Sequence, residues 1–567
     1  MKKIKTSIAI LLSLTMLTIV AVTCVPVSAA TYAGGNGTEQ EPYEIATAEQ
    51  LVALASEVNG GKNQSGVYFK LTADITLNDT SDWENWTGET APANEWTPIG
   101  NNENQFAGVF DGNGKTVSGI FISSEKGYVG LFGGVSGAVK NLTVDKSYIS
   151  IKGTNQSYLG AIAGTVTGTV ESCESYATVA GGNMGAGGIA GNCINGIISK
   201  CANYGIVDGY QQVGGIVGAL GGTVSQCVNE GTVDGSKQFV GGIVGIAGAS
   251  KKPAVVINCL NVGAVTTPST GGGIAGRYGN VANCAITNCI NGGNIIVGQY
   301  GGHIFGSAKS GNVCTVVNCY YDKSASADTT ITSYGSNPDN IAESTACEKS
   351  QICGLSALLT TGFDDSIWRA TIYGYPRLIN VANYNSEVSV TMIDGAAARI
   401  SSETKLRFLN KIDKEAYDSL VSIYGQNNVI IGTLIAKKSD VEASGGGLNF
   451  EDISSEKTVC YIPTMWYDIT ATEYVYSGYV EPLHSDNYGT EYCARAYVKI
   501  VYGEGADEFV VFYSDEVQTR SIDYVVTEAL ADVADTVDEK YIYDTNSGKY
   551  SPYTQEEQTT LHELLAS

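Results

Sequence analysis

The sequence predicts a mainly β protein, in which a right-handed parallel β-helix is followed by an α+β domain with a mostly antiparallel sheet. Three observations predict this. A short glycine-rich phrase recurs seven times between residues 130 and 306, a cysteine-bearing phrase recurs in step with it, and the composition changes after residue 386. The closing glycines of the seven phrases are 27 to 31 residues apart: Gly133, Gly164, Gly191, Gly218, Gly245, Gly276 and Gly306. A period of this length is typical of stacked repeats.

Residues 1–30 have the features of a secretory signal peptide. Three lysines within the first five residues precede an apolar run over residues 8–25, and small residues end the segment at 27–30. We expect this segment to be cleaved rather than kept as a membrane anchor, and expect no stable membrane insertion afterwards. Cys24 follows Thr23 instead of the small residue that a lipoprotein signal requires, so lipidation is not expected.

Residues 31–125 are expected to form an amino-terminal cap. Thr47 is a suitable N-cap for a short amphipathic helix over residues 48–55, and apolar strands are expected near residues 68–71, 75–77 and 108–110. Such a helix would cover the open end of a stack of strands. Trp83, Trp86 and Trp96 could stack on sugar rings, but we prefer the interpretation that they pack the cap loop.

Residues 126–323 contain the repeats. Each repeat consists of two or three short apolar β segments separated by glycine and asparagine, which tolerate positive φ at corners. Asn-x-Gly turns are expected at Asn203, Asn229, Asn261 and Asn291. Stacked coils would pair each strand with its neighbours and close a continuous core. The right-handed sense follows from the general preference of parallel crossovers.

The repeated phrase resembles a known motif. Gly-Gly-Ile-Val-Gly at 214–218 is followed by Cys-Val-Asn-Glu-Gly-Thr-Val at 227–233, and this combination resembles the GLUG motif found in arrays on secreted bacterial surface proteins. The resemblance covers about residues 31–380. It implies an extracellular, adhesin-like protein of a Gram-positive bacterium, and it supplies no catalytic residue.

One cysteine occurs at the same place in each of six repeats. These residues are Cys173, Cys201, Cys227, Cys259, Cys289 and Cys319. We expect buried free thiols that fill space, because parallel side chains in a stacked column give poor disulfide geometry. Thirteen cysteines remain after removal of the signal peptide, so complete intramolecular pairing is impossible, although Cys347 and Cys353 are close enough to pair. No Cys-x-x-Cys pair suggests a zinc site.

The repeats contain few groups for bond-breaking chemistry. Residues 126–323 include seven acidic and eleven basic side chains. Asp208 and Asp234, each within Val-Asp-Gly, could form an acid–base pair or a metal site, but we prefer to interpret them as corner residues. Arg277 and His303 are the single arginine and histidine of this span, and we expect His303 to serve packing. We therefore assign no catalytic, cofactor-binding or metal-binding residue, and expect no cofactor.

Residues 324–386 are expected to form the second cap and a linker. A short helix is expected near residues 356–359, and the phrase at 374–378 resembles one that closes such arrays. Residues 380–386 are polar enough for a linker.

Residues 387–567 form a different module, with 31 acidic and 13 basic residues. Helices are expected at 414–424 and 521–533, and strands at 388–393, 406–409, 429–436, 459–462, 474–480, 492–502 and 509–513. The module resembles a carboxy-terminal module of secreted clostridial proteins without assigned activity. Arg399, Arg407 and Arg495 could together bind a carboxylate or phosphate, but we prefer individual ion pairs with nearby carboxylates.

These features favour a secreted, non-enzymatic, adhesin-like protein that binds a glycan or another surface through a β-helix face. One alternative is a polysaccharide lyase or glycoside hydrolase on the same scaffold. Another is a β-helix spacer that presents a carboxy-terminal binding module. The expected partner is an extracellular polysaccharide or a cell-surface component. The protein is expected to be a monomer. A formal net charge of −25 argues against a nucleic-acid partner.

Overall fold

The computed structural model describes residues 32–125, 127–152, 157–278, 281, 283–308, 315–328, 330–335, 344–379, 388–399, 404–463, 465–502, 508–531, 542–544 and 549–551. The expected signal peptide and linker lie outside these residues. The chain divides into two compact units, one with residues 1–285, 295–315 and 334–341, the other with residues 286–294, 316–333 and 342–567. The domain boundaries given above stay predictions.

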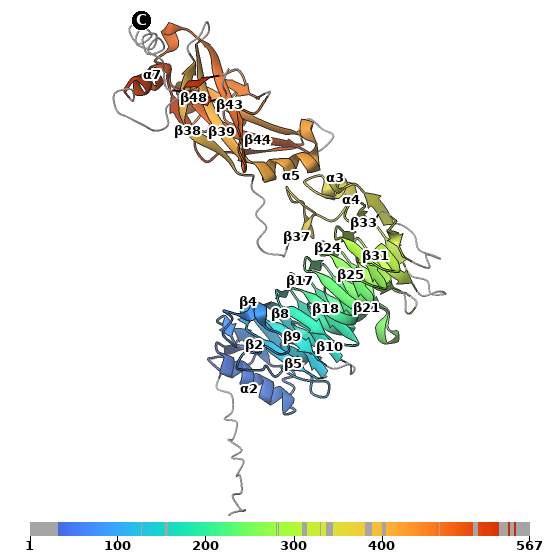
Figure 1. Ribbon diagram of the computed structural model, residues 1–567. Coiled ribbons are helices and arrows are strands. Elements are labelled where there is room, and N and C mark those ends of the chain that lie inside the picture. Colours follow the sequence, from blue (N-terminus) through green and yellow to red (C-terminus); the bar gives the residue numbers. More distant parts are fainter. Residues whose placement is uncertain are drawn as a thin grey trace, which may run out of the picture. The chain divides into compact units, whose positions relative to one another are not determined.

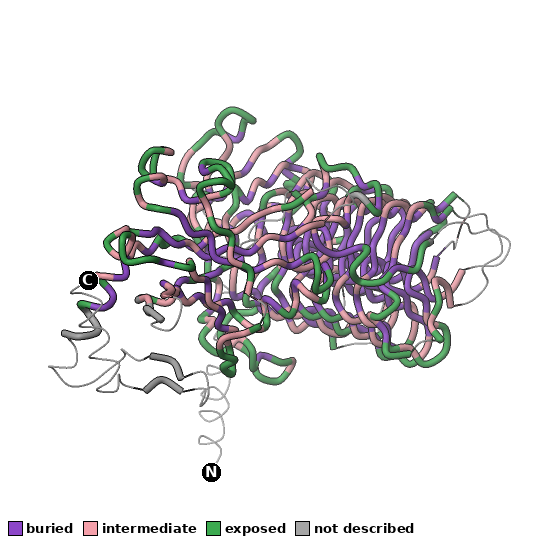
Figure 2. The backbone as a smooth tube through the Cα atoms, turned by 90° about the horizontal axis from the view of Figure 1, so that it is seen from above, coloured by how far each residue is buried: buried purple, intermediate pink, exposed green. Residues whose placement is uncertain are grey.

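The amino-terminal part of the chain is a β-solenoid of about ten turns (Figure 1). Its strands pair in parallel and in register; for example, Val207, Asp208 and Gly209 face Val233, Asp234 and Gly235. The predicted parallel β-helix is therefore confirmed, while its right-handed sense stays a prediction. Figure 2 shows buried segments recurring through the stacked coils.

The strands are short. Those before the repeats are β1 Tyr43–Ile45, β2 Tyr68–Leu71, β3 Ile75–Thr76, β4 Val109–Ser118 and β5 Phe121–Ser124. The next are β6 Gly127–Val129, β7 Phe132–Val135, β8 Ala138–Asp145, β9 Tyr148–Ile151, β10 Ser157–Gly160, β11 Ala163–Val166, β12 Thr169–Glu171, β13 Glu174–Ser175, β14 Thr178–Gly181, β15 Gly185–Gly187, β16 Ala190–Ser199, β17 Ala202–Asn203, β18 Val207–Gly214, β19 Val217–Ser225, β20 Val228–Asn229, β21 Val233–Gly241 and β22 Val244–Ala247. The series ends with β23 Val255–Ile257, β24 Leu260–Asn261, β25 Val265–Thr267, β26 Thr270–Gly272, β27 Ala275–Tyr278, β28 Ala285–Thr287, β29 Ile290–Asn291, β30 Ile295–Val297, β31 Tyr300–Ala308, β32 Thr315–Val317, β33 Cys319–Asp322, β34 Thr332–Tyr334 and β35 Ser344–Cys347.

The expected cap helix is α2, Ala48–Asn59. Thr47 accepts a hydrogen bond from the backbone N–H of Gln50, whose side chain in turn accepts from the backbone N–H of Thr47. Leu51, Leu54 and Val58 form the buried face of the helix. The helix lies at the amino-terminal end of the solenoid, as a cap must (Figure 1).

The glycines of the repeated phrase are required by close backbone approach. None of them has positive φ among the described residues, so tolerance of positive φ, the reason given above, is wrong for them. A Cβ at Gly218 would lie 2.6 Å from the backbone nitrogen of Ala186 and 2.8 Å from the carbonyl carbon of Gly185. A Cβ at Gly215 would lie 2.1 Å from the carbonyl oxygen of Gly242. Only glycine fits where two backbones are this close.

The asparagines of the Asn-x-Gly segments form a buried ladder. Asn203, Asn229 and Asn261 are fully buried. The side-chain amide of Asn203 donates to Oδ1 of Asn229 at 2.9 Å, and that of Asn229 donates to Oδ1 of Asn261 at 2.9 Å. The same Asn229 amide also donates to the carbonyl of Gly231 at 2.9 Å. These bonds link successive coils through the interior.

The six cysteines of the column are free and fully buried, as predicted. In the first unit the thiol of Cys227 lies 3.3 Å from the carbonyl oxygen of Ser225, and Cys173, Cys201 and Cys259 make the equivalent contact. Burial raises the pKa of the Cys173 and Cys227 thiols. Cys347 and Cys353 are both free, so the disulfide considered for them is not formed.

The residue before each column cysteine adopts the left-handed conformation, with φ between 53° and 55° at Ser172, Lys200, Gln226, Asn258, Asn288 and Asn318. Asparagine tolerates this conformation, whereas glutamine and lysine are strained in it. We expect Gln226→Asn to raise the free energy of unfolding by about 0.5–1 kcal/mol. Thermal unfolding followed by circular dichroism measures this. Ser225→Asn, in the neighbouring extended position, is the control; an equal gain for both variants would contradict the explanation.

The second unit contains the second cap and the carboxy-terminal module. The cap helices are α3 Lys349–Ile352 and α4 Ala357–Thr361, and β36 Trp368–Arg369 pairs with β37 Arg377–Leu378. The hydroxyl of Tyr375 donates to the buried carboxylate of Asp322 at 2.7 Å. The hydroxyl of Tyr424 accepts from the N–H of Leu355 and donates to the carbonyl of Ile372. The cap residues Cys353 and Ile372 share one core with the module.

The module contains two antiparallel sheets, as the prediction of a mostly antiparallel domain requires. One sheet has the order β38 Val390–Arg399, β39 Thr404–Asp413, β43 Glu473–Leu483 and β42 Asp468–Ile469. The other has β41 Thr458–Tyr461, β40 Val429–Lys437, β44 Tyr492–Val501 and β45 Phe509–Tyr513, with β46 Gln518–Arg520 also on β44. Two further strands form a hairpin, β47 Ile542–Asp544 and β48 Lys549–Ser551. The helices are α5 Lys414–Tyr424, α6 Lys438–Ala443 and α7 Ile522–Ala531.

Candidate functional site

Each glycine-rich phrase forms a corner between two strands of the solenoid, for example between β18 and β19. The apolar residue at the centre of each phrase is fully buried: Leu131, Ile162, Ile189, Ile216, Ile243, Ile274 and Ile304. Each phrase therefore places one apolar side chain in the core, between the two strands that flank it. Outward side chains from these two strands meet across the corner, because Phe239 before one phrase packs with Ile246 after it.

We define the corner site by two rows of side chains in the first unit. The first row contains residues that follow one another in register just before the phrases. They lie two positions before the first glycine of the first six phrases and one position before Gly301 in the last: Tyr128, Tyr158, Gly185, Gln212, Phe239, Thr270 and Tyr300. The second row contains the residue after each closing glycine from the second phrase on: Thr165, Asn192, Ala219, Ile246, Arg277 and Ser307. Strands β18 and β21 carry the middle of the first row (Figure 1).

Aromatic rings dominate the first row. The rings of Tyr128 and Tyr158 are stacked, with centroids 5.5 Å apart and planes 27° apart. Gly185, the next residue of the row, leaves room for the Tyr158 ring, because a Cβ there would lie 2.9 Å from it. Burial, and secondarily Tyr128, raises the pKa of the Tyr158 hydroxyl, which stays neutral at physiological pH. Phe239 has φ of 63°, a conformation that is rare for a bulky residue.

The second row supplies polar groups next to these rings. Asn192 is 5% exposed, and its amide donates to Oγ1 of Thr165 at 3.3 Å. Its buried Oδ1 accepts no hydrogen bond from the described residues. The guanidinium of Arg277 lies 5.0 Å from the centroid of the Phe239 ring. An unsatisfied buried acceptor favours a ligand that brings a donor, since such groups are costly to leave unpaired.

Asp208 and Asp234 are brought side by side on adjacent strands, as their matching positions predict. Both lie inside strands, so their interpretation as corner residues is wrong. Burial, and secondarily Asp234, raises the pKa of Asp208. The register continues to Ala180 on one side and Thr266 on the other, so the described strands place no third acid in this row. Lys237 lies over the neighbouring Tyr210 ring at 4.9 Å.

Two of the three tryptophans of the cap serve packing, as preferred above, while Trp83 is half-buried. Trp86 and Trp96 are buried, and the Trp96 indole N–H donates to the carbonyl of Leu131. Trp86 contacts Phe121 edge to face at 5.9 Å. A hollow of about 570 Å³ lies beside Trp86 and is lined mainly by residues 76–82 and 91–94. His303 is also buried, in agreement with a packing role.

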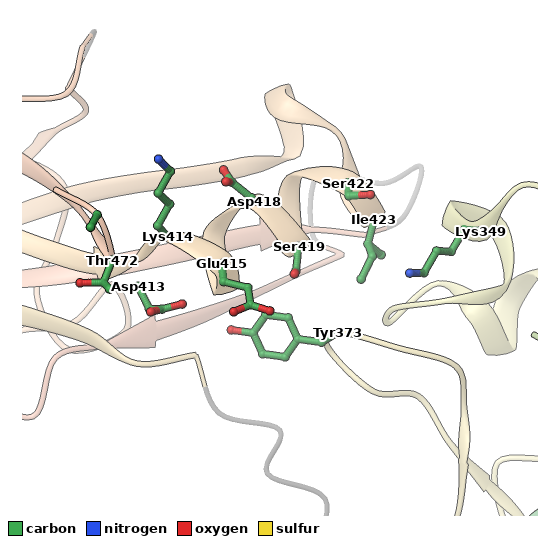
Figure 3. Close-up of a pocket in the computed structure, with 11 residues that line it drawn as sticks. Lys349, Tyr373, Asp413, Lys414, Glu415, Asp418, Ser419, Ser422, Ile423 and Thr472 are labelled. Atoms are coloured by element: carbon green, nitrogen blue, oxygen red, sulfur yellow. The ribbon is translucent and has the colours of Figure 1, made fainter. Parts of the chain in front are cut away.

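A second hollow of about 570 Å³ lies in the second unit, at the start of α5 (Figure 3). Lys349 and Tyr373 of the cap and Asp413, Lys414, Glu415, Asp418, Ser419, Ser422, Ile423, Ala471 and Thr472 of the module line it. Asp413 caps α5 by accepting from the N–H of Ala416, and Asp418 accepts from the Tyr474 hydroxyl at 3.0 Å. Both carboxylates are therefore used in hydrogen bonds that stabilise the module itself.

The structure describes the side chains of two of the three candidate arginines of the module, Arg407 and Arg495, and these have separate contacts. Arg495 donates to the carbonyls of Ser514 and Leu448, so its expected carboxylate partner is absent among the described residues. Arg407 stacks on the Tyr467 ring at 4.9 Å, and its Nε is buried without a described acceptor. The Arg399 side chain lies outside the described residues. The preferred ion pairs are therefore wrong for Arg407 and Arg495.

Comparisons with known proteins give limited relationships. No model of a protein family matches the chain. A segment of 145 residues is 35% identical to "Putative Gly-rich membrane protein" of Evansella cellulosilytica, covering 25% of this chain and 15% of that protein. A segment of 146 residues is 34% identical to "Halomucin" of Haloquadratum walsbyi, covering 24% of this chain and 1% of that protein. The chain thus spans only a small part of the curated relatives that it matches.

A solved structure also aligns with the chain. The crystal structure of "a putative immunoglobulin A1 protease" from Bacteroides ovatus aligns over 62% of this chain and 96% of that chain, with 20% identity and a TM-score of 0.41. Among the described residues, no helix is both long enough and apolar enough to cross a membrane.

Proposed function

We propose that this protein is a secreted or cell-surface, non-enzymatic protein that binds an extended glycan along the corner site. The observation that carries the proposal is the pair of parallel rows in that site. The first row contains the stacked rings of Tyr128 and Tyr158 and the Phe239 ring, and the second row contains Asn192, whose buried Oδ1 has no described donor. Aromatic rings next to polar groups suit sugar rings, which carry both apolar C–H groups and hydroxyls, and the amide oxygen suits a sugar hydroxyl.

The repeat geometry supports an extended ligand. Equivalent positions recur at each coil, about 4.8 Å apart, so neighbouring coils offer similar contacts along a polymer. The names of the two relatives, a Gly-rich membrane protein and a halomucin, are in line with a surface location. The resemblance to GLUG arrays, the Gram-positive origin and the signal peptide are part of this proposal.

The lyase or hydrolase alternative lacks support at the aspartate pair. Calcium-dependent lyases use clusters of acidic ligands with a basic group, and glycosidases use two carboxylates that face each other across the bond to be cleaved. Asp208 and Asp234 instead lie on adjacent strands with Ala180 and Thr266 as their neighbours in register. No group of three or more potential metal-binding side chains occurs among the residues that the structure describes.

Removing the aromatic side chains tests the proposed function. We expect the double substitution Tyr158→Ala and Phe239→Ala to weaken binding to a glycan identified on an array at least about tenfold, or ~1.4 kcal/mol. Affinity electrophoresis with the polymer in the gel measures this.

Tyr176→Ala is the matched control. Tyr176 is 40% exposed and stacks on Tyr204 at 4.6 Å, but it is not part of the corner site. Equal retention of the double variant and the wild type would contradict the corner site. If deletion of residues 387–567 then abolished retention, the array would be a spacer for a module that binds.

A further inference from the structure

We infer that the glycan at the corner site is anionic, and that one part of the corner recognises its charge. This part, the cationic segment, contains Lys237, Lys251, Lys252 and Arg277. The inference rests on the proposed function, because it assigns the chemical class of the ligand to the same site.

The cationic segment is attached to residues that build the corner. Arg277 follows Ile246 in register on the second row, and its guanidinium lies against the Phe239 ring of the first row. Lys237 lies two residues before Phe239 on β21. Ala249, which packs with Ile246 and Phe239, begins the short 3₁₀ helix Ala249–Lys251. Lys252 follows this helix. Its Cβ packs against Gly221, because a Cβ added to Gly221 would lie only 2.9 Å from it.

These four cations have no carboxylate partner among the described residues. The described ion pairs of the first unit use other lysines, namely Lys62 with Glu57, Lys140 with Asp111 and Lys200 with Glu171. Lys237, Lys251 and Lys252 are exposed, and Arg277 is half-buried. Although Asp234 is three residues before Lys237, the Lys237 ammonium lies over the Tyr210 ring. In a chain with a net charge of −25, a group of unpaired cations requires an explanation.

The chemistry of the segment favours carboxylate or sulfate groups carried on a polysaccharide. A guanidinium held against an aromatic ring keeps its in-plane N–H groups free, and these match the two oxygens of such an anion. The lysine ammonium groups add attraction that salt weakens. The neighbouring aromatic row supplies the sugar contacts that a simple polyanion would not use.

Three polymers of equal length and with the same backbone test the inference: dextran, carboxymethyl-dextran and dextran sulfate. Binding of each polymer to the full mature chain is measured by affinity electrophoresis. We expect at least one anionic derivative to bind about tenfold tighter than dextran. Comparison of the two derivatives distinguishes carboxylate from sulfate recognition. Arg277→Gln combined with Lys251→Ala and Lys252→Ala should reduce binding of the anionic polymer to the level of dextran, while Lys200→Ala, which removes a paired lysine, should not.

Each outcome decides the inference. Equal binding of all three polymers, or unchanged binding by the charge variant, overturns it but leaves the proposed function in place. If the protein binds none of the three polymers, the inference is overturned as well. Polyglutamate serves as a polyanion without sugars; if it binds as tightly as the best dextran derivative and Tyr158→Ala weakens neither, recognition of a glycan is excluded and the proposed function fails too. Circular dichroism melting confirms that the variants are folded.

Discussion

Gly218→Ala is expected to lower the free energy of unfolding by about 3 kcal/mol or more, or to prevent accumulation of folded protein. The added methyl group would lie 2.6 Å from the Ala186 backbone nitrogen and 2.6 Å from the Gln212 carbonyl oxygen. Both are backbone atoms of stacked strands, so neither can move without disturbing the register of the coils. Thermal and urea-induced unfolding, followed by circular dichroism, measures the effect.

Gly88→Ala is the matched control for this substitution. A Cβ at Gly88 also meets a close atom, Cε of Lys152 at 2.9 Å, but this atom belongs to a flexible side chain. We expect a change within about 0.5 kcal/mol, as for ordinary surface substitutions. If Gly218→Ala and Gly88→Ala had similar small effects, close backbone approach would not explain the glycines of the phrase.

Asn229→Ala is the second substitution with a large expected effect, a loss of about 3–5 kcal/mol. It removes the donor to the Gly231 carbonyl and to Oδ1 of Asn261, and the acceptor of the Asn203 amide. All these groups are buried, so the three hydrogen bonds are lost in the interior, where water does not replace them; the Asn203 amide keeps its bond to the carbonyl of Gly205. Asn102→Ala, at an exposed position of the cap, should change the stability by less than about 0.5 kcal/mol. A small effect at Asn229 would show that the ladder does not support the stacking of coils.

Asn229→Asp adds a pH dependence to the same test. The new carboxyl would be fully buried, so its folded-state pKa would be raised above the ordinary value of about 3.9. A raised acid pKa means that the stability of the variant is highest at low pH, where the group is protonated, and falls as the pH rises through the unfolded-state pKa. We therefore expect Asn229→Asp to be closer to wild type at pH 4 than at pH 8; the opposite trend would contradict burial of this position.

The sequence allowed much of the fold to be predicted, because the information lies in local periodicity. The recurrence of closing glycines predicted the stacked coils, and Gly425 marked the end of α5 at the observed residue, Tyr424. The bounds of β45 agree with the predicted strand over residues 509–513. The buried thiols of the cysteine column were predicted from the recurrence of one cysteine at the same place in six repeats.

The internal contacts between coils could not be predicted in the same way. Glycine is selected here by distances between backbones of successive coils, and asparagine by hydrogen bonds along the stack; both depend on a register that a single repeat does not reveal. The same limitation applies to the aspartates, since Asp208 within a Val-Asp-Gly triplet is equally compatible with a turn and with a strand.

The corner site was missed for a related reason. Its residues share no motif, since tyrosine, glycine, glutamine and phenylalanine alternate in one row. The available signal was positional: aromatic residues recur two places before the first glycine of a phrase at Tyr128, Tyr158 and Phe239, and one place before it at Tyr300. Arg277 occupies the place after a closing glycine. Aligning the repeats by phrase would have placed these residues in two rows. Only the packing of Phe239 with Ile246 and with Arg277 shows that the two rows meet across the corner.

The most direct test of this account is to incubate the purified mature chain with the carboxymethyl- and sulfate-substituted dextrans and to measure both retention and polymer length. The account predicts that an anionic polymer is retained through the corner site, and that the recovered polymer has an unchanged length by size-exclusion chromatography. The account would be contradicted if the recovered polymer chains were shorter. It would also be contradicted if neither the wild type nor the corner variants retained the polymer.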